Sequence, residues 1–488
     1  MPVRARLRRV ADFGGSEGGS PPLFTKMIGD YLVMDKTKCA AITKKGVTNM
    51  TVGSPLCLIL LFGLPLILAN TLQQVYSTVD TIILGRYGGV TGLAVLGTSS
   101  WPVWLSVSIQ TNFSQASSLL VAKRFGSGDL EEMRHAIGNV LISALVLCLS
   151  IMVISQFLVL PALLWQNTPT DVMEQAILYL RITFGGIFIL FSYNILAAFL
   201  RAVGDGKTPL LAIFAATAVN IVLDVYFVAK LNWGAPGAAL ATLIAQASSV
   251  IVCLLRIRAN PLFRLEKRHF RLNGSILQEY ISLAIPMLLQ SCVIALGGFF
   301  VQAHINEYGS VFVAGMSATV KVFSLLETAA IALAQATATF VSQNYGCFQF
   351  DRIRKGIRLS IVFSLLIAAL LCSSMMLFGR PLLSLFVTED AIDISWGLLV
   401  TMSLGLFIMY PMYVMRQSMQ ALGNALIPLL AAVIQLFARI LVTLLLPKVL
   451  GRAGLYFPTV VAWLTSLILI GILLPPWLKR CEQLSEIK

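Results

Sequence analysis

The chain has 488 residues, of which 57% are hydrophobic and only 12% are charged, and its formal net charge is +14. Soluble domains carry about a quarter charged residues, so this composition excludes an ordinary soluble protein and indicates a polytopic membrane protein. The basic residues are spread over short connectors between apolar segments, a distribution that favours membrane topology over nucleic-acid binding.

The chain begins with a polar, basic segment, residues 1–50, that precedes the first long apolar stretch. This segment lacks the apolar core of a secretory signal, so a cleaved signal is not expected. We predict a cytoplasmic extension without ordered structure.

Twelve apolar segments follow, each long enough to cross a bilayer as a helix of about 20 residues. Backbone polar groups in hydrocarbon must be paired within their own segment, so the spans are helices and the fold is all-α. The segments lie near residues 56–84, 93–121, 136–160, 176–200, 209–231, 236–257, 276–303, 313–341, 357–379, 396–420, 426–447 and 455–478.

The basic residues gather in alternate connectors, with the longest basic connector at about 256–275 and a last pair at Lys479 and Arg480. Positively charged connectors stay in the cytoplasm, so both termini are predicted to be cytoplasmic.

The two halves of the chain repeat each other at an offset of about 220 residues: Pro65 matches Pro286, and residues 209–211 match 428–430. Six spans per unit give both units the same orientation, with a pseudo-twofold axis along the membrane normal. Chance similarity among apolar helices is the alternative. We predict a two-lobed protein, with its parts at residues 51–257 (helices 1–6), 258–275 (cytoplasmic linker), 276–478 (helices 7–12) and 479–488 (cytoplasmic tail).

The first helix carries Pro65 and Asp80, and both are costly there. An internal proline removes a backbone hydrogen bond and tends to bend a helix, so we predict a hinge at Pro65. A carboxylate at membrane depth is costly enough to indicate a function.

Four further polar residues are predicted at the depth of Asp80: Tyr76, Asn220, Asp224 and Thr242. Tyr76 and Asp80, like Asn220 and Asp224, are spaced i,i+4 and so share one helix face. Oxygen ligands suit a hard cation, so we predict that Asp80, Asn220, Asp224 and Thr242 bind Na⁺, with Tyr76 beside them. They equally suit a proton, because burial and a second acid favour the protonated carboxyl. The alternative is that the acids only accept interhelical hydrogen bonds.

The second half has no acid at the positions equivalent to Asp80 and Asp224, which confines the predicted cation site to the first lobe. It carries other charges within its spans, predicted to be buried and to pair or line a cavity. A static salt bridge at Glu327 and ordinary packing of the methionines are the alternatives. The predicted substrate-cavity residues are Lys321, Glu327, Arg416, Arg439 and Met287.

Several motifs are absent from the sequence. Without a GxxxxGK[ST] loop the chain encodes no ATP motor, and no ATPase subunit is expected. The lack of HExxH and GxSxG motifs argues against an enzyme. The histidines have no partner cluster in the sequence and are assigned no role. We expect a monomer that needs no cofactor beyond its coupling ion.

The residues quoted above resemble multidrug and toxic compound extrusion (MATE) transporters, in particular the DinF-like bacterial branch. The resemblance covers nearly the whole chain after about residue 50. It is carried by GSPL at 53–56, LPLILANTLQQVYSTVDTIILGRYGG at 64–89, LRAVGDGKTP at 200–209, NIVLD at 220–224, GAALAT at 237–242 and FVSQNYG at 340–346.

This resemblance implies two six-helix lobes in a bacterial inner membrane and cation-coupled export of small, often cationic or amphipathic compounds by alternating access. It places Tyr76, Asp80, Asn220, Asp224 and Thr242 in a proton and sodium site, and Pro65 at the bend of helix 1. The other branch of the family has cation acids on helices 7 and 10. Helix 10 of this chain has Arg416 and no acid, so that site is not expected.

Three other functions remain open from the sequence. A flippase for lipid-linked oligosaccharides or lipids, from the same superfamily, would favour a basic cavity. The two acids oppose this function, and four basic residues allow it: Arg181, Lys321, Arg416 and Arg439. A membrane-embedded enzyme is disfavoured by the absent motifs. A channel would be distinguished by conductance far above carrier rates.

Overall fold

Long helices account for nearly all of residues 47–486, the part of the chain described by a computed structural model. Eleven of these helices are long and apolar enough to cross a membrane, or twelve when one bent pair is counted as a span, which confirms the all-α architecture. The α-helices are α3 Pro55–Tyr87, α4 Gly89–Gly126, α5 Leu130–Trp165, α6 Thr170–Gly185, α7 Ile187–Ala202, α8 Lys207–Asp224, α9 Gly234–Ala259, α10 Gly274–Asn306, α11 Ser310–Gly346, α12 Phe350–Leu383, α13 Glu389–Ala421, α14 Leu426–Leu450 and α15 Pro458–Glu486. Shorter helices are η2 Val225–Lys230, η3 Pro261–Phe263, η4 Lys267–Phe270 and η5 Gly451–Tyr456.

One predicted span is broken in the structure. The segment predicted as one helix at 176–200 consists of α6 and α7, which meet at Gly186 with a bend of 42°. A Cβ atom on Gly186 would lie 2.1 Å from the side chain of Leu243 in α9. The glycine therefore lets α9 pack into the bend.

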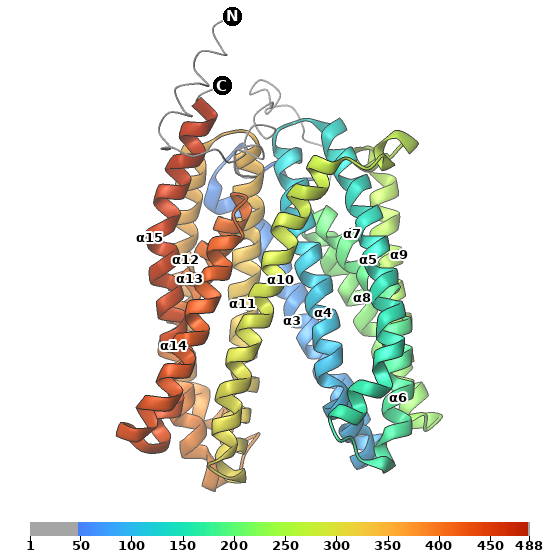
Figure 1. The fold of residues 1–488 in the computed structure, drawn as a ribbon, viewed down its shortest axis with the longest axis vertical. Coiled ribbons are helices and arrows are strands. Elements are labelled where there is room, and N and C mark those ends of the chain that lie inside the picture. Colours follow the sequence, from blue (N-terminus) through green and yellow to red (C-terminus); the bar gives the residue numbers. More distant parts are fainter. Residues whose placement is uncertain (1–46, 487–488) are drawn as a thin grey trace, which may run out of the picture.

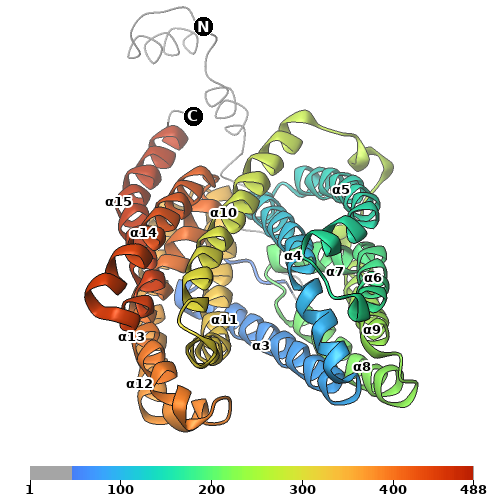
Figure 2. The ribbon, with the colours of Figure 1, turned by 60° about the horizontal axis from the view of Figure 1, so that its bottom comes forward.

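The helices form two groups that diverge from one end of the molecule (Figure 1). We call α3–α9 the N-lobe and α10–α15 the C-lobe. Helix α3 packs against α8 in its own lobe and α11 in the other, while α10 packs against α14 and α4. The first helix of each lobe thus contacts the second helix of the other, as a pseudo-twofold arrangement requires. The view in Figure 2 places α3 and α11 side by side between the lobes.

The lobes meet closely where α4 and α11 end, and we call this the closed end (residues 123–127 and 343–347). A Cβ atom built on Gly126 would lie 2.0 Å from the backbone oxygen of Gln343, and one on Gly346 would lie 2.0 Å from that of Lys123. The two backbones touch here without side chains between them. Only glycine permits this approach.

A buried ion-pair group joins the lobes at the closed end. Glu279 of α10 accepts from Arg124 Nη2 at 2.7 Å and lies 3.5 Å from Lys123 Nζ, both on α4. All three side chains are at most 10% exposed. Buried charges that keep their partners hold one arrangement of the lobes, because separating them leaves uncompensated charge.

Residues 47–54 run between the two lobes at the closed end. The backbone N–H of Thr48 donates to Val203 of the N-lobe, and Arg352 of the C-lobe donates to the backbone oxygens of Met50 and Gly53. Met50 is fully buried. Residues 47–50, assigned to the extension by the sequence, are instead packed in the protein, because neighbouring side chains pair their backbone groups. The rest of that prediction, residues 1–46, lies outside the described residues.

Gln343 connects three parts of the closed end. Its Nε2 donates to the carbonyl of Ala202 at 2.8 Å, and its Oε1 accepts from the backbone N–H of Met50 at 2.8 Å. Gln343→Leu leaves both backbone groups buried and unpaired, a cost of about 1–3 kcal/mol each. We expect a clearly lower melting temperature in detergent. Gln349→Leu is the control, because Gln349 Oε1 has no hydrogen-bond partner; an equal loss in both variants would contradict the bridging role.

Candidate functional site

The structure brings all five predicted cation-site residues together in the N-lobe. Helix α3 carries Tyr76 and Asp80, α8 ends on Asp224 with Asn220 one turn before it, and α9 carries Thr242. The Tyr76 hydroxyl lies 3.4 Å from Thr242 Oγ1. The carboxyl groups of Asp80 and Asp224 lie close enough to interact electrostatically, and Tyr76 interacts with both.

Several polar atoms of this cluster are buried without a hydrogen-bond partner, although Tyr76, Asp80 and Thr242 as whole residues are half-buried. Asn220 and Asp224 are fully buried. Among the described residues, both Asp224 carboxyl oxygens, Asn220 Oδ1 and Nδ2, and Asp80 Oδ1 have no hydrogen-bond partner. Each such group costs about 1–3 kcal/mol when left unpaired. A cluster of orphaned oxygens with two acids fits a bound cation or proton, which would satisfy the oxygens and neutralise the repulsion.

Sequence reasoning missed three features around this site. Helix α8 does not continue as a regular helix past Asp224 but becomes the π-helix η2, a form often found at functional sites. Tyr179 of α6 interacts electrostatically with Asp80. Gln246 lies one turn after Thr242 on α9 and has a buried, unpaired Oε1. Gln246 could have been predicted, because it is spaced i,i+4 from Thr242 and so shares its helix face. No local sequence pattern predicts that Tyr179 lies near Asp80.

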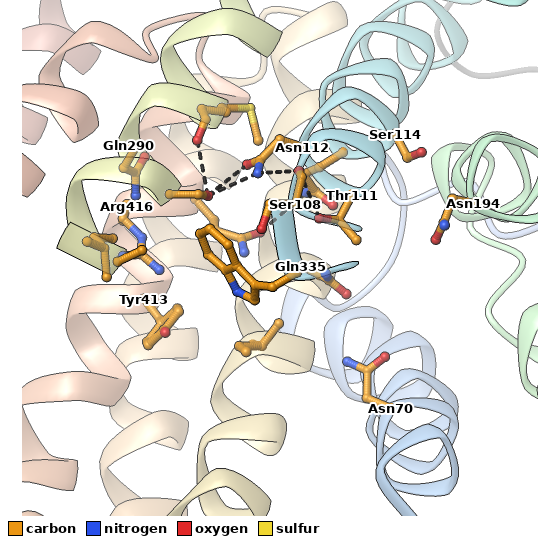
Figure 3. A pocket seen from close by; sticks show the side chains of 18 of the residues that line it. Asn70, Ser108, Thr111, Asn112, Ser114, Asn194, Gln290, Gln335, Tyr413 and Arg416 are labelled. Carbon is orange, nitrogen blue, oxygen red and sulfur yellow. Dashed lines mark hydrogen bonds between the residues drawn. The ribbon is translucent and has the colours of Figure 1, made fainter. Parts of the chain in front are cut away.

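A cavity of about 950 Å³ lies between the lobes. Helices α4 and α10 join across it, since Asn112 Nδ2 donates to Ser291 Oγ at 3.0 Å and Trp101 stacks on Phe299. Side chains from both lobes point into it (Figure 3). The lining is rich in amides, namely Asn70, Gln73, Asn112, Gln115, Asn194, Gln290, Gln302, Gln335, Gln417 and Gln420.

Helix α3 connects the cavity to the acid site. Ala69 and Gln73 line the cavity, and Tyr76 and Asp80 follow on the same face at helical spacing. The rise from Gln73 to Asp80 is about 10 Å. A displacement of α3 that follows ion binding therefore reaches the cavity wall directly.

The predicted hinge, Pro65, lies inside α3, which continues through it as a helix. It immediately precedes Leu66, the first residue of α3 that lines the cavity. The proline thus stands where the cavity-lining part of the helix begins.

The predicted substrate-cavity residues divide into two groups. Met287, Arg416 and Arg439 line the cavity. Glu327 does not; it accepts a hydrogen bond from the hydroxyl of Tyr413, which lines the cavity, and it forms no ion pair with a described residue. Lys321, predicted to be buried, is exposed and outside the cavity lining, because its position on α11 faces away from the helix packing.

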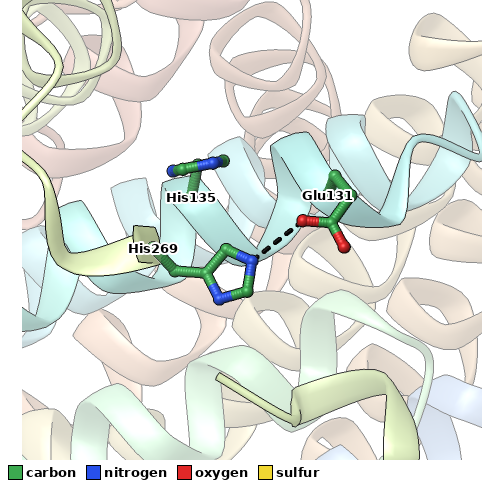
Figure 4. Close-up of side chains that lie close together, drawn as sticks. All are labelled: Glu131, His135 and His269. Atoms are coloured by element: carbon green, nitrogen blue, oxygen red, sulfur yellow. Dashed lines mark hydrogen bonds and ion pairs between the residues drawn. The ribbon is translucent and has the colours of Figure 1, made fainter. Parts of the chain in front are cut away.

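A second polar cluster lies at the start of α5, where Glu131 and His135 meet His269 of η4 (Figure 4). The three ligand atoms lie within 4.8 Å of one another, and no motif in the sequence predicted this cluster. His269 Nδ1 accepts from the backbone N–H of Glu266 at 2.7 Å, so the ring proton of neutral His269 is on Nε2, which donates to Glu131 Oε2 at 2.9 Å. The cluster therefore holds the inter-lobe linker against the N-lobe rather than offering a free metal ligand at Nε2.

The comparisons with known proteins agree with this architecture. A sequence model of the MatE family matches residues 65–226 and again 286–445, two copies that begin 221 residues apart and confirm the internal repeat. The probable multidrug resistance protein YoeA of Bacillus subtilis is 28% identical over 78% of this chain and 83% of its own. The probable multidrug resistance protein NorM of Thermotoga maritima is 23% identical over 87% and 93%.

The fold matches solved structures as well. A MATE protein solved in the bent conformation superposes with a TM-score of 0.85 at 21% identity, covering 91% of this chain and 100% of that one. The two family matches together span about two thirds of the sequence. The chain therefore belongs to the MatE family of polytopic membrane transporters.

Proposed function

We propose that the chain exports small amphipathic compounds in exchange for Na⁺ or H⁺ by alternating access, as a multidrug efflux transporter. The observation that carries this proposal is the pair of acids with unpaired carboxyl oxygens, Asp80 on α3 and Asp224 at the end of α8. The face of α3 that carries Asp80 also lines the inter-lobe cavity. The curated relatives quoted above are described as probable multidrug resistance proteins, which supports the substrate class.

The exchange follows from the charge of the acid site. In the arrangement sealed at the closed end, a cation binds between Asp80 and Asp224 and neutralises them. Helix α3 then shifts about Pro65, and the cavity releases its substrate. When the closed end opens, the cation leaves and the charged site restores the affinity for substrate. Coupling requires the two ligands to differ in affinity between the two arrangements, typically by about 1–3 kcal/mol.

We place the protein in the bacterial inner membrane with the closed end in the cytoplasm. Basic residues concentrate at that end, including Lys123 and Arg124 on α4 and Arg352 and Arg354 at the start of α12. Positively charged segments remain in the cytoplasm. We propose a monomer without catalytic activity and without a cofactor other than the coupling ion.

Efflux measured in proteoliposomes tests the coupling. A fluorescent amphipathic compound is followed while a sodium gradient and a pH gradient are imposed separately, and one of the two is expected to drive export. Asp80→Asn should abolish the driven export and leave the protein folded, because the amide cannot carry the charge that the cation neutralises. Gradient-driven exchange that persists unchanged in Asp80→Asn would show that the site assignment is wrong.

The lipid flippase alternative is favoured by one observation, the presence of Arg201, Arg416 and Arg439 in the cavity lining. Movement of a fluorescent lipid across the bilayer, with no movement of a soluble compound under either gradient, would support it over drug export.

A further inference from the structure

The charged residues of the inter-lobe cavity are all of one sign. Arg201, Arg416 and Arg439 line it, and no aspartate, glutamate or lysine in the described part of the chain does. None of the three arginines forms an ion pair with an acid among residues 47–486. An arginine keeps its charge at any physiological pH, so the substrate cavity is a permanently positive compartment.

Arg439 is the most constrained of the three. Its side chain is 8% exposed, its Nη1 donates to the carbonyl of Ile294 at 3.3 Å, and its Nε is buried without a hydrogen-bond partner. Gly297 gives it room, because a Cβ atom there would lie 3.2 Å from Arg439 Cδ. The helix packing thus accommodates the buried guanidinium of Arg439 in the wall of the inter-lobe cavity. Its Nε–H donor remains without a hydrogen-bond partner.

Arg416 enters the same cavity from α13 (Figure 3). Its guanidinium lies 4.2 Å from the centre of the Tyr413 ring, whose hydroxyl donates to Glu327. Glu327 is the acid that interacts with Tyr413 and Arg439, and it does not line the cavity. One acid against two arginines leaves this wall with an excess positive charge. Arg416 also interacts with the Tyr413 hydroxyl, but a guanidinium has five N–H donors, so it retains donors for a ligand.

An aromatic group lines the cavity where α4 meets α10. Trp101 of α4 stacks on Phe299 of α10 with ring centres 3.7 Å apart, and Trp104 meets the Trp101 ring edge at 5.4 Å. All three line the cavity. Aromatic faces bind flat apolar bodies, while guanidinium groups bind carboxylate, sulfonate and phosphate oxygens.

Resting on the proposed export function, we propose that the substrate is an amphipathic organic anion, with its acidic group on Arg416 and Arg439 and its apolar body toward Trp101 and Phe299. This differs from the cationic compounds expected from the resemblance. A cation would meet three arginines and no acid, a like-charge arrangement that disfavours binding. The acid site is separate, so loading it with a cation does not compete with an anionic substrate for ligands.

Equilibrium binding in detergent tests this without any gradient. The anisotropy of carboxyfluorescein and of rhodamine 6G, two xanthene dyes of opposite charge, is measured against the purified full chain. We expect tighter binding of carboxyfluorescein, weakened about tenfold or more by Arg416→Gln and partly restored by Arg416→Lys. Arg452→Gln, the same charge change at an exposed residue outside the cavity lining, is the control and should bind as the native protein does.

Two results would overturn the proposal: tighter binding of rhodamine 6G, or carboxyfluorescein binding that Arg416→Gln and Arg452→Gln change equally or not at all. Competition identifies the source of the anion. Displacement of the dye by naphthalene-2-sulfonate indicates a free solute, and displacement by phosphatidylglycerol but not phosphatidylcholine indicates a lipid headgroup. Arg416-dependent binding without gradient-driven export would refute the export function and leave the anion site standing.

Discussion

Replacing Asp224 by asparagine is expected to lower cation-driven export by about 100-fold or more while leaving the protein at least as stable as the native form. The acid is fully buried, and neither of its carboxyl oxygens has a hydrogen-bond partner. In the native protein its charge is opposed by Asp80, and a neutral amide removes that repulsion and can donate to Asp80. The same change removes the charge on which the proposed coupling depends, and losing a coupling of about 3 kcal/mol corresponds to about 150-fold.

Asp205 provides a matched control in the same lobe. It is also buried, at 5% exposed, but its oxygens accept from the Thr208 backbone N–H, the Thr208 hydroxyl and Arg256 Nε at 3.0, 2.7 and 3.2 Å. Asp205→Asn disturbs a satisfied network at the start of α8, so we expect a loss of about 1–2 kcal/mol in stability with unchanged ion dependence.

Melting temperatures measured with and without Na⁺, and at several pH values, separate the two variants. The native protein and Asp205→Asn should each be stabilised by the coupling ion, because an ion that binds only the folded state raises its stability. Asp224→Asn should show no such stabilisation. A loss of stability in Asp224→Asn with its ion dependence retained would mean that this acid serves packing rather than coupling.

The acid site was predictable because its residues repeat at helical spacing within apolar segments. Tyr76 and Asp80, and Asn220 and Asp224, are i,i+4 pairs whose cost in hydrocarbon is apparent from sequence alone. Tyr179 was not predictable, since its approach to Asp80 depends on where α6 packs against α4 and α9. The bend at Gly186 that positions α6 is likewise set by contact with Leu243 of α9.

The cavity was predicted less well than the acid site. From the sequence, all charged residues of the C-lobe spans were predicted to line the cavity or to pair. The rotation of each helix about its axis decides which of these side chains face the cavity. Lys321 turns out to be exposed, and Glu327 lies behind Tyr413. That no described acid lines the cavity is a property of the assembled lobes, and only the three-dimensional arrangement shows it. The internal repeat, in contrast, was predictable, because the matching positions of glycines and prolines in the two halves are visible in the sequence alone.

Placing a methyl group at Gly126 or Gly346 is expected to open the closed end and to reduce export strongly. A Cβ atom at either position would lie 2.0 Å from a backbone oxygen of the opposite lobe. Backbone atoms cannot move away as a flexible side chain does, so α4 and α11 must separate. Neither glycine has a positive φ, so the substitution acts through contact and not through backbone strain. Under the proposed mechanism, the seal at the closed end is then lost, and with it one of the two arrangements that exchange requires.

Spin labels on unnatural amino acids at the exposed Lys207 and Lys355, in opposite lobes, report this separation by pulsed electron resonance. We expect Gly126→Ala and Gly346→Ala to shift the distance distribution to longer values. Gly97→Ala is the matched control, because it lies in the same helix as Gly126 and its Cβ would meet nothing within 4 Å. Unchanged distances and native export in Gly126→Ala would show that the lobes tolerate this contact by local adjustment. A longer distance with export lost, and neither effect in Gly97→Ala, would identify the glycine crossing as the seal that alternates during transport.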